Sequence, residues 1–251
     1  MKKNLFFRSS AALLSLCMIA ALTSCAAKEV NENTSSTPSD EAKEKYIALT
    51  FDDGPNTTTT NEVLDILEEY DVKASFFLIG DNINANSEKT VKRAYDMGCE
   101  LDNHSKSHDY MNKMSVDEIK EEIRYVNDYV YKITGEYPSF FRPPYIAVSK
   151  DMYDAIDLPF ISGAGCDDWM DDVTAKQRAD TVIKNAKDGQ IVLLHDAEGN
   201  KQTVKALKTI IPTLQQEGYT FVTLNELFDY KNVEPDEDHM YSIVPDTDSA
   251  A

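Results

Sequence analysis

Three stretches of the sequence combine residue types that could carry out hydrolysis. Each contains or follows a short apolar run, and they are T-F-D-D-G-P at residues 50–55, L-D-N-H-S-K-S-H at residues 101–108 and I-V-L-L-H at residues 191–195. Two histidines four residues apart, together with one carboxylate, offer three protein ligands to a metal and leave coordination positions open. This set is typical of a hydrolytic zinc site and also of a non-haem iron site.

Each of these residues also has an ordinary structural interpretation. Asp-Gly and Gly-Pro pairs are frequent in turns, and a single histidine after a buried strand, as His195 would be, is commonly a hydrogen-bonded structural residue. Two further polar stretches lie between, F-R-P-P-Y at residues 141–145 and D-D-W at residues 167–169. Arg142 could pair with a surface carboxylate, Asp168 could cap a segment, and Trp169 could belong to the core.

Strands alternating with helices must position these residues. The expected strands are Tyr46–Phe51, Ala74–Ile79, Cys99–Asn103, Ser139–Arg142, Phe160–Gly165, Ile191–His195 and Thr220–Leu224. Ser115 with Glu118 opens a helix that ends before Gly135, and Thr174 with Gln177 opens one that ends before Gly189. This alternation predicts an α/β fold with a parallel sheet, either barrel-like or doubly wound. In both, the chemistry lies where strands end.

The two ends of the chain differ in composition from its centre. Residues 1–25 combine a basic start, an apolar run and L-T-S-C, which predicts a lipoprotein-type signal peptide with the lipid on Cys25; an ordinary secretory signal is the alternative. Residues 26–43 predict a flexible tether. Residues 229–251 carry seven acids and one lysine, which predicts a loosely attached acidic tail. We therefore expect an exported protein, lipid-anchored to the cell membrane or secreted, with its catalytic domain at residues 44–228.

Charge and cysteine content restrict the partners and the redox chemistry. The net charge is -19, and it becomes -22 without residues 1–25, which hold three basic and no acidic residues. Nucleic acid and anionic lipid headgroups are therefore poor partners, whereas a neutral or cationic glycan is compatible. Outside the predicted signal, Cys99 and Cys166 remain, and two buried free thiols are favoured over a disulfide.

Taken in order at the ends of successive strands, the five stretches resemble the five motifs of the polysaccharide deacetylase family. This is carbohydrate esterase family four, whose domain is also called the nodulation-type deacetylase homology domain. The resemblance covers about residues 44–228. It implies a distorted parallel (β/α) barrel of about seven strands, with the site at the strand carboxyl ends and an acetylated polysaccharide as substrate.

The resemblance also implies a role for each candidate residue. The implied roles are Asp53, His104 and His108 as metal ligands, Asp52 as general base oriented by Arg142, His195 as general acid supported by Asp168, and Pro143, Trp169, Leu193 and the Tyr145 backbone N–H as substrate contacts. Nitrogen and oxygen ligands in a hydrolase favour Zn²⁺, with Co²⁺ as a substitute. Lys106 stands where family members often have an aromatic residue, and Asp168-Trp169 lacks the further upstream aspartate of the longer fourth motif, so the glycan preference stays open.

The favoured function is metal-dependent N-deacetylation of N-acetylglucosamine residues in peptidoglycan or a chitin-like glycan. The close alternative is an acetylxylan esterase that uses the same site on an ester bond. A non-catalytic glycan-binding module and an iron-dependent oxygenase are less consistent with the sequence, because neither accounts for Asp52, Arg142 and His195 together. We expect a monomer whose only membrane contact is the lipid on Cys25.

Overall fold

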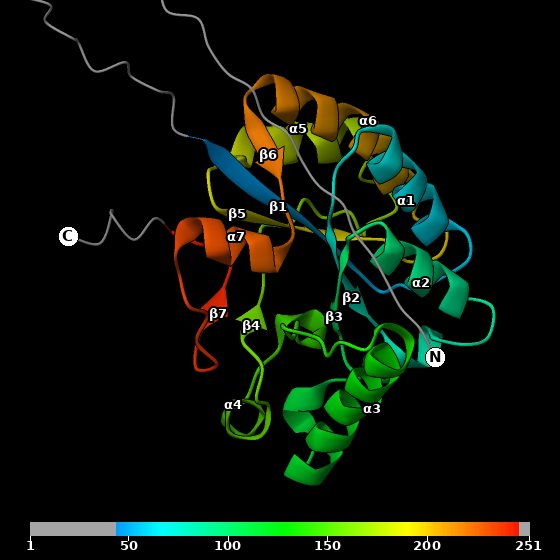
Figure 1. The fold of residues 1–251 in the computed structure, drawn as a ribbon, viewed down its shortest axis with the longest axis vertical. Coiled ribbons are helices and arrows are strands. Elements are labelled where there is room, and N and C mark those ends of the chain that lie inside the picture. Colours follow the sequence, from blue (N-terminus) through cyan, green and yellow to red (C-terminus); the bar gives the residue numbers. More distant parts are fainter. Residues whose placement is uncertain (1–43, 246–251) are drawn as a thin grey trace, which may run out of the picture. The chain divides into compact units, whose positions relative to one another are not determined.

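The computed structural model describes residues 44–245 (Figure 1). The predicted signal peptide, the predicted tether and the end of the predicted tail, residues 246–251, lie outside the described residues. Within the described part, no helix has the length and apolar character needed to cross a membrane.

Parallel strands form the centre of the described part. The strands are β1 (Lys45–Asp52), β2 (Ser75–Leu78), β3 (Glu100–Asn103), β4 (Phe160–Ile161), β5 (Gln190–His195), β6 (Tyr219–Phe221) and β7 (Met240–Tyr241). The main sheet has the order β3-β2-β1-β5, β6 pairs with the first residues of β1, and β4 pairs with β7. All of these strand pairings are parallel.

Single bridges close the sheet into a distorted barrel. Phe141 bridges Asn103 of β3 and Phe160 of β4, and Ala164 bridges Val192 of β5, all in parallel orientation. The expected (β/α) barrel is thereby confirmed.

Two of the expected strands are shorter than the sequence pattern indicated. The stretch Ser139–Arg142 contributes a bridge and no strand, because prolines flank it on both sides and cannot donate to a ladder. Phe160–Gly165 keeps only Phe160–Ile161 as β4, since Gly163 adopts a φ of +111° that turns the chain.

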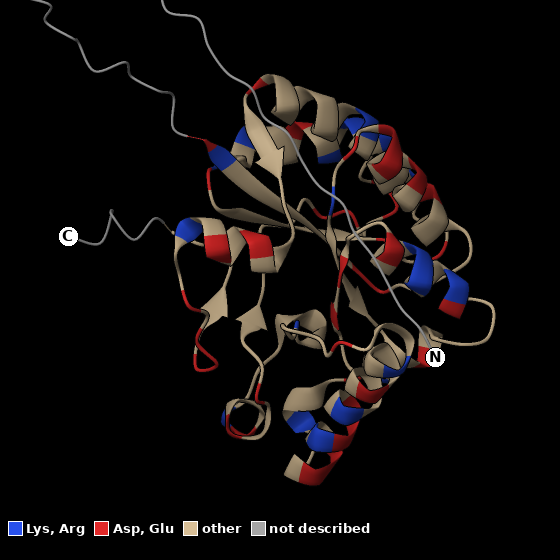
Figure 2. Cartoon of the chain, viewed as in Figure 1, with Lys and Arg blue, Asp and Glu red and all other residues tan. Residues whose placement is uncertain are grey.

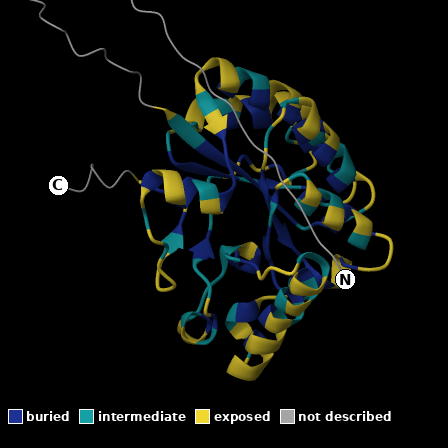
Figure 3. Ribbon diagram, viewed as in Figure 1, coloured by how far each residue is buried: buried dark blue, intermediate teal, exposed yellow. Residues whose placement is uncertain are grey.

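Helices lie around the strands (Figure 1), and their bounds are α1 (Thr59–Glu69), α2 (Glu88–Asp96), α3 (Val116–Thr134), α4 (Lys150–Ala155), α5 (Ala175–Asn185), α6 (Lys201–Gln216) and α7 (Leu224–Lys231). Their inner faces and the strands are buried (Figure 3), while lysines and arginines mix with acids on the outer faces (Figure 2). Both expected capping boxes are present, and α3 ends at the left-handed Gly135. Helix α5 ends earlier than expected, since Ala186 is extended.

The two cysteines of the described part are free and buried, as predicted. Cys99 and Cys166 belong to the main core cluster, which also contains apolar residues of β1, β2, β5, α1 and α6. Burial raises the pKa of Cys99 to about 11 and that of Cys166 to about 12, so both thiols are protonated at neutral pH.

The expectation of a loosely attached tail is wrong for residues 229–245. Helix α7 extends to Lys231, β7 pairs with β4, and Val244 is fully buried. Val244 N–H donates to the Gly189 carbonyl at 2.8 Å, and a Cβ on Gly189 would lie only 2.0 Å from the Val244 oxygen, so this position requires glycine. The acids of residues 229–245 are exposed, whereas Tyr241 and Val244 belong to a core cluster and Val233 packs against it.

Candidate active site

The polar residues selected from the sequence meet at the carboxyl ends of the strands. Asp52 ends β1 and lies in register with His195, the last residue of β5, so their side chains share one face of the sheet. A cavity of about 470 Å³ opens at this position, and its lining residues are Asp52, Asp53, His104, His108, Pro143, Tyr145, Ile146, Trp169, Leu193 and His195. Nine of these ten residues were selected from the sequence; Ile146 was not.

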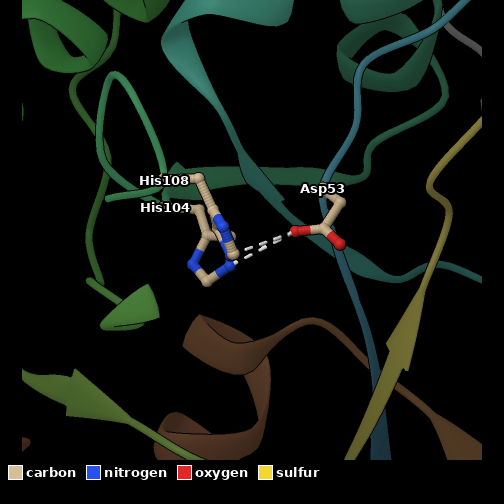
Figure 4. Close-up of side chains that lie close together, drawn as sticks. All are labelled: Asp53, His104 and His108. Atoms are coloured by element: carbon tan, nitrogen blue, oxygen red, sulfur yellow. Dashed lines mark ion pairs between the residues drawn. The ribbon is translucent and has the colours of Figure 1, made fainter. Parts of the chain in front are cut away.

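Asp53, His104 and His108 converge in this cavity (Figure 4). Asp53 Oδ1 lies 3.6 Å from His104 Nε2 and 3.4 Å from His108 Nε2, and the three ligand-type atoms lie within 4.8 Å of one another. Asp53 Oδ1 is buried and accepts no hydrogen bond from the described residues. A buried carboxylate oxygen without a donor, facing two imidazole nitrogens, fits a divalent cation.

Backbone contacts fix the direction of the His104 ring and the position of the His108 backbone. His104 Nδ1 donates to the Arg142 carbonyl at 2.7 Å, which leaves Nε2 as the unprotonated atom toward Asp53. Burial lowers the pKa of His104 despite the nearby charges of Asp52 and Asp53, which favours the neutral, ligating form. His108 has a φ of +62°, and its N–H donates to Ser105 Oγ at 3.0 Å.

A second pair lies behind the cavity, between Asp52 and Arg142. Arg142 is fully buried, its Nη1 donates to Asp52 Oδ1 at 2.5 Å, and its Nη2 donates to Thr50 Oγ1 at 2.8 Å. Burial alone would raise the pKa of Asp52, but the Arg142 charge, with smaller contributions from His104 and His195, lowers it overall. The carboxylate of Asp52 is therefore ionised at neutral pH.

His195 and Asp168 form a third pair. His195 Nδ1 donates to Asp168 Oδ1 at 2.7 Å, and the backbone N–H of His195 donates to Asp168 Oδ2 at 2.8 Å. Thr203 Oγ1 also donates to Asp168 Oδ2, at 2.7 Å. Burial lowers the pKa of His195, but the hydrogen bond to Asp168 and the surrounding negative charges outweigh it and raise the pKa to about 9.

Arg178 supports this third pair and was not selected from the sequence. It is 2% exposed, and its guanidinium donates to the carbonyls of Val173 and Met170 and to Thr203 Oγ1 at 2.8–2.9 Å. The sequence did contain a signal that Arg178 is buried, because it lies four residues before Val182 and thus on the apolar face of α5.

Asp196 supports the turn that carries Asp53 and was likewise not assigned a role. Its buried carboxylate accepts from the Gly54 N–H at 3.1 Å and from Thr60 Oγ1, and its own N–H donates to the Asp52 carbonyl at 3.0 Å. A Cβ on Gly54 would lie 2.5 Å from Asp196 Oδ2, so glycine is required there. Burial raises the pKa of Asp196 to about 7. The turn interpretation of Asp-Gly-Pro is therefore also correct, and it coexists with the site.

The expected substrate contacts form walls of the same cavity. Trp169 is 67% exposed and Tyr145 is 55% exposed, so neither belongs to the core. Pro143 and Leu193 complete the apolar lining. Tyr145 and Ile146 both have left-handed backbone, with φ of +58° and +54°, which is unfavourable for side chains with a Cβ and is typical of functional turns.

Comparison with known proteins places the chain among its relatives. Residues 39–159 match the family model for polysaccharide deacetylase. A peptidoglycan-N-acetylglucosamine deacetylase of Bacillus cereus is 40% identical over 196 residues, which are 75% of this chain and 91% of that protein. The chain belongs to the polysaccharide deacetylase family.

Other polysaccharide deacetylase relatives are connected with xylan. A bifunctional xylanase/deacetylase of Pseudobutyrivibrio xylanivorans is 50% identical over 196 residues, which are 78% of this chain but only 32% of that protein, so the chain spans about a third of its length. The Xyl-CE4 domain of a multidomain xylanase from the hindgut metagenome of Trinervitermes trinervoides superimposes with a TM-score of 0.79 at 49% identity, over 81% of this chain and 100% of that one. A family 4 acetyl xylan esterase of Clostridium thermocellum, solved with a cobalt ion, superimposes with a TM-score of 0.78 at 43% identity. The match covers 80% of this chain and 100% of that one.

Proposed function

We propose that this chain is a metal-dependent hydrolase that removes acetyl groups from a polysaccharide. The observation that carries the proposal is that one cavity joins the Asp53, His104 and His108 ligand set to Asp52 and His195. Because Asp52 is ionised and His195 is protonated at neutral pH, a base and an acid are available together.

Asp53, His104 and His108 would hold the metal. A divalent ion bound there would lower the pKa of a coordinated water and polarise the acetyl carbonyl. We assign zinc, because two imidazoles and one carboxylate with open positions are the ligands of hydrolytic zinc sites, and cobalt as its substitute. The cobalt ion solved in the Clostridium thermocellum acetyl xylan esterase supports a divalent ion and cobalt as the substitute.

Asp52 would act as the general base. Arg142 occupies its Oδ1, so Oδ2 is the oxygen available to the cavity, 3.7 Å from His104 Nε2. From there Asp52 takes a proton from the attacking water. Arg142 fixes the carboxylate direction and keeps it charged.

His195 would act as the general acid. Asp168 binds its Nδ1, which leaves the Nε2–H to protonate the departing oxygen or amine. The backbone N–H of Tyr145, in the left-handed turn, would donate to the acetyl oxygen as negative charge develops on it. Trp169 and Leu193 would enclose the acetyl methyl group.

We propose ester-linked acetyl groups of xylan as the preferred substrate. The xylan-connected relatives have identities of 50%, 49% and 43%, and two of them are matched over their whole solved chain. The N-acetylglucosamine substrate that the sequence analysis favoured is the second candidate, supported by the 40% identity with the Bacillus cereus enzyme. Both substrates place the same acetyl group between the same walls.

We also propose that the protein is exported and acts as a monomer tethered through a lipid on Cys25. The basic and apolar pattern of residues 1–25 supports export, and the L-T-S-C sequence supports the lipid.

The function is tested by acetate release from acetylated xylan and from N-acetylglucosamine oligomers, measured on residues 44–251 with zinc and with a chelator. We expect zinc-dependent release that is faster from xylan. Zinc at a hundredfold excess over its Kd should stabilise the fold by about 2.7 kcal/mol, and the chelator should remove this gain. Faster release from the N-acetyl oligomers would reverse the choice of substrate, and chelator-resistant release would contradict the mechanism.

A further inference from the structure

A column of side chains in ring contact runs from the ligand set to the surface: the two histidines are tilted, Tyr145 meets His108 edge-on, and Tyr110 stacks on Tyr145. We call it the ring column, and its members are His104, His108, Tyr145, Tyr110 and Lys113. Successive ring centroids lie 4.9, 4.7 and 4.1 Å apart, and the Lys113 ammonium lies 4.3 Å from the Tyr110 centroid. Figure 4 shows the inner end of the column, where both histidine rings face Asp53.

Tyr110 is the only aromatic ring of the column that the mechanism does not use. It lies outside the five stretches selected from the sequence and outside the lining of the 470 Å³ cavity. It is nevertheless fixed in place, because it directly precedes the short 3₁₀ helix Met111–Lys113, whose first residue is 1% exposed and belongs to a core cluster. A ring attached to this anchored segment can serve as a support.

The turn that Tyr110 contacts needs such a support. Tyr145 and Ile146 both have left-handed backbone, which a β-branched residue such as Ile146 rarely adopts. Hydrogen bonds from Ile146 N–H to Pro143 and from Ala147 N–H to Pro144 close the turn. The Tyr145 side chain is 55% exposed, so burial alone holds it weakly. The near-parallel Tyr110 ring, at 17° to it, provides the missing packing.

We propose that Tyr110 is a positioning residue for two groups of the site. Through Tyr145 it keeps the left-handed turn in place and so directs the backbone N–H of Tyr145 into the cavity. Through the edge contact of Tyr145 with His108 it holds that imidazole in its ligating orientation. The first effect rests on the proposed function, whereas the second concerns metal affinity and stands without it.

The packing around Tyr110 bears on whether its ring supports Tyr145 or contacts a sugar. Tyr145 covers the Tyr110 ring at 4.1 Å, and the Lys113 ammonium covers it at 4.3 Å. Both contacts occupy the Tyr110 ring, which is 46% exposed. The KM for oligosaccharides therefore decides between support of Tyr145 and contact with a sugar.

The test uses Tyr110→Ala, Tyr110→Phe and a matched control, Tyr131→Ala. Tyr131 is 47% exposed and stacks on Tyr137 at 4.4 Å and 17°, and it does not line the cavity. The readouts are kcat and KM for the small ester 4-nitrophenyl acetate, kcat and KM for acetylated xylo-oligosaccharides, and the Kd of Zn²⁺ for the apoprotein by calorimetry.

For Tyr110→Ala we expect kcat on the small ester to fall about tenfold at unchanged KM, and the Zn²⁺ Kd to rise about tenfold. Tyr110→Phe keeps the ring and should stay within about twofold of wild type in both, as should Tyr131→Ala. Wild-type kcat and Zn²⁺ affinity in Tyr110→Ala would overturn the proposal. A higher KM for oligosaccharides alone would also overturn it, since it would show a sugar contact, as would equal losses in Tyr131→Ala.

The two proposals fail in different ways. If the wild-type protein releases no acetate from any substrate, the proposed function is wrong. The Zn²⁺ affinities of Tyr110→Ala and Tyr110→Phe then test whether Tyr110 holds the His108 imidazole in its ligating orientation. Equal affinities of the two variants would overturn that role.

Discussion

Asp52 and His195 stand in register on neighbouring strands, yet their partners shift their pKa values in opposite senses. Arg142 lowers the pKa of Asp52, and Asp168 raises that of His195 to about 9. Each group is therefore charged at neutral pH although burial opposes both charges. The residues behind the cavity thus set the protonation states of the residues that line it.

Asp168→Asn should shift the alkaline limit of activity to lower pH. His195 acts when protonated, so wild-type activity should fall as the pH rises through about 9. The raised pKa also stabilises the fold below the ordinary histidine pKa of about 6.5, and this stability is lost as the pH rises through the folded value. Without the Asp168 carboxylate, only the charges of Asp52 and Asp53 oppose the lowering of the His195 pKa by burial. The alkaline limit of activity should therefore fall toward pH about 6.5. A pH–kcat profile checks this, with the exposed neighbour Asp167→Asn as control; coincident profiles would contradict it.

Asp52→Asn should lower acetate release by about 10² or more, because the base is lost. It should also destabilise the fold by about 3 kcal/mol, since it removes the counter-charge of the fully buried Arg142. Kinetics and urea unfolding measure the two effects. Asp81→Asn, at an exposed side chain, should change neither. A folded Asp52→Asn variant with wild-type release would exclude Asp52 as the base.

At the scale of elements, helix α5 buries an arginine that stabilises its neighbours through hydrogen bonds. Arg178 lies on the buried face of this helix and ties the Met170–Val173 loop to Thr203 of α6. Thr203 in turn donates to Asp168. The helix therefore carries the support of the acid pair without lining the 470 Å³ cavity itself.

Arg178→Lys should destabilise the fold by about 2–3 kcal/mol, because lysine cannot reproduce the fork of donors and leaves buried carbonyls unpaired. Arg124→Lys is the matched control. Arg124 is also helical but 61% exposed, and its pairs with Glu121 and Asp128 are surface pairs worth less than about 1 kcal/mol. Chemical denaturation of both variants gives the comparison; equal losses would show that the buried contacts of Arg178 contribute nothing special.

Local sequence patterns predicted most helices and strands. The wrong or missing predictions have causes either within the segment or in contacts between residues far apart in the sequence. Apolar runs and capping boxes sufficed for β1, β2, β3, β5 and α3, because those signals lie within the segment. Phe141 makes bridges only, owing to its proline neighbours. Arg178 could not be assigned, since its partners Asn200 and Thr203 lie 22 and 25 residues away and a helix pattern does not show which neighbour will cover it.

At the scale of the whole described domain, the C-terminal segment packs against two strands of the barrel. Its strand β7 pairs with β4, and its Ile243 bridges Gln190 of β5 in antiparallel orientation. Val244→Ala should therefore lower the unfolding free energy by about 2 kcal/mol. Val116→Ala, at a 39% exposed helix position, should change it by less than about 0.5 kcal/mol. Similar values in urea unfolding would mean that the segment is dispensable.

Closure of the barrel was not readable from pattern alone. Alternating strands and helices are equally compatible with a doubly wound sheet, and the bridges that decide the matter join residues far apart, such as Ala164 with Val192. Family resemblance supplied the barrel. The site was more accessible, because every parallel strand delivers its next residues to the same end in either architecture. The tail was misjudged because the high proportion of charged residues concealed two buried apolar side chains, those of Tyr241 and Val244.

The pairing of the last strand also sets an order of events during synthesis. β1, the first strand of the described residues, pairs with β5, and Thr50 Oγ1 donates to the Val192 carbonyl, 142 residues further along the chain. Residues 240–244 then lie against both β4 and β5. A ribosome covers the newest part of the chain, so the contacts of residues 240–244 with β4 and β5 form only after these residues have emerged from it. Contacts between residues so far apart in the sequence form slowly, and the β4 edge that β7 covers stays unpaired until then.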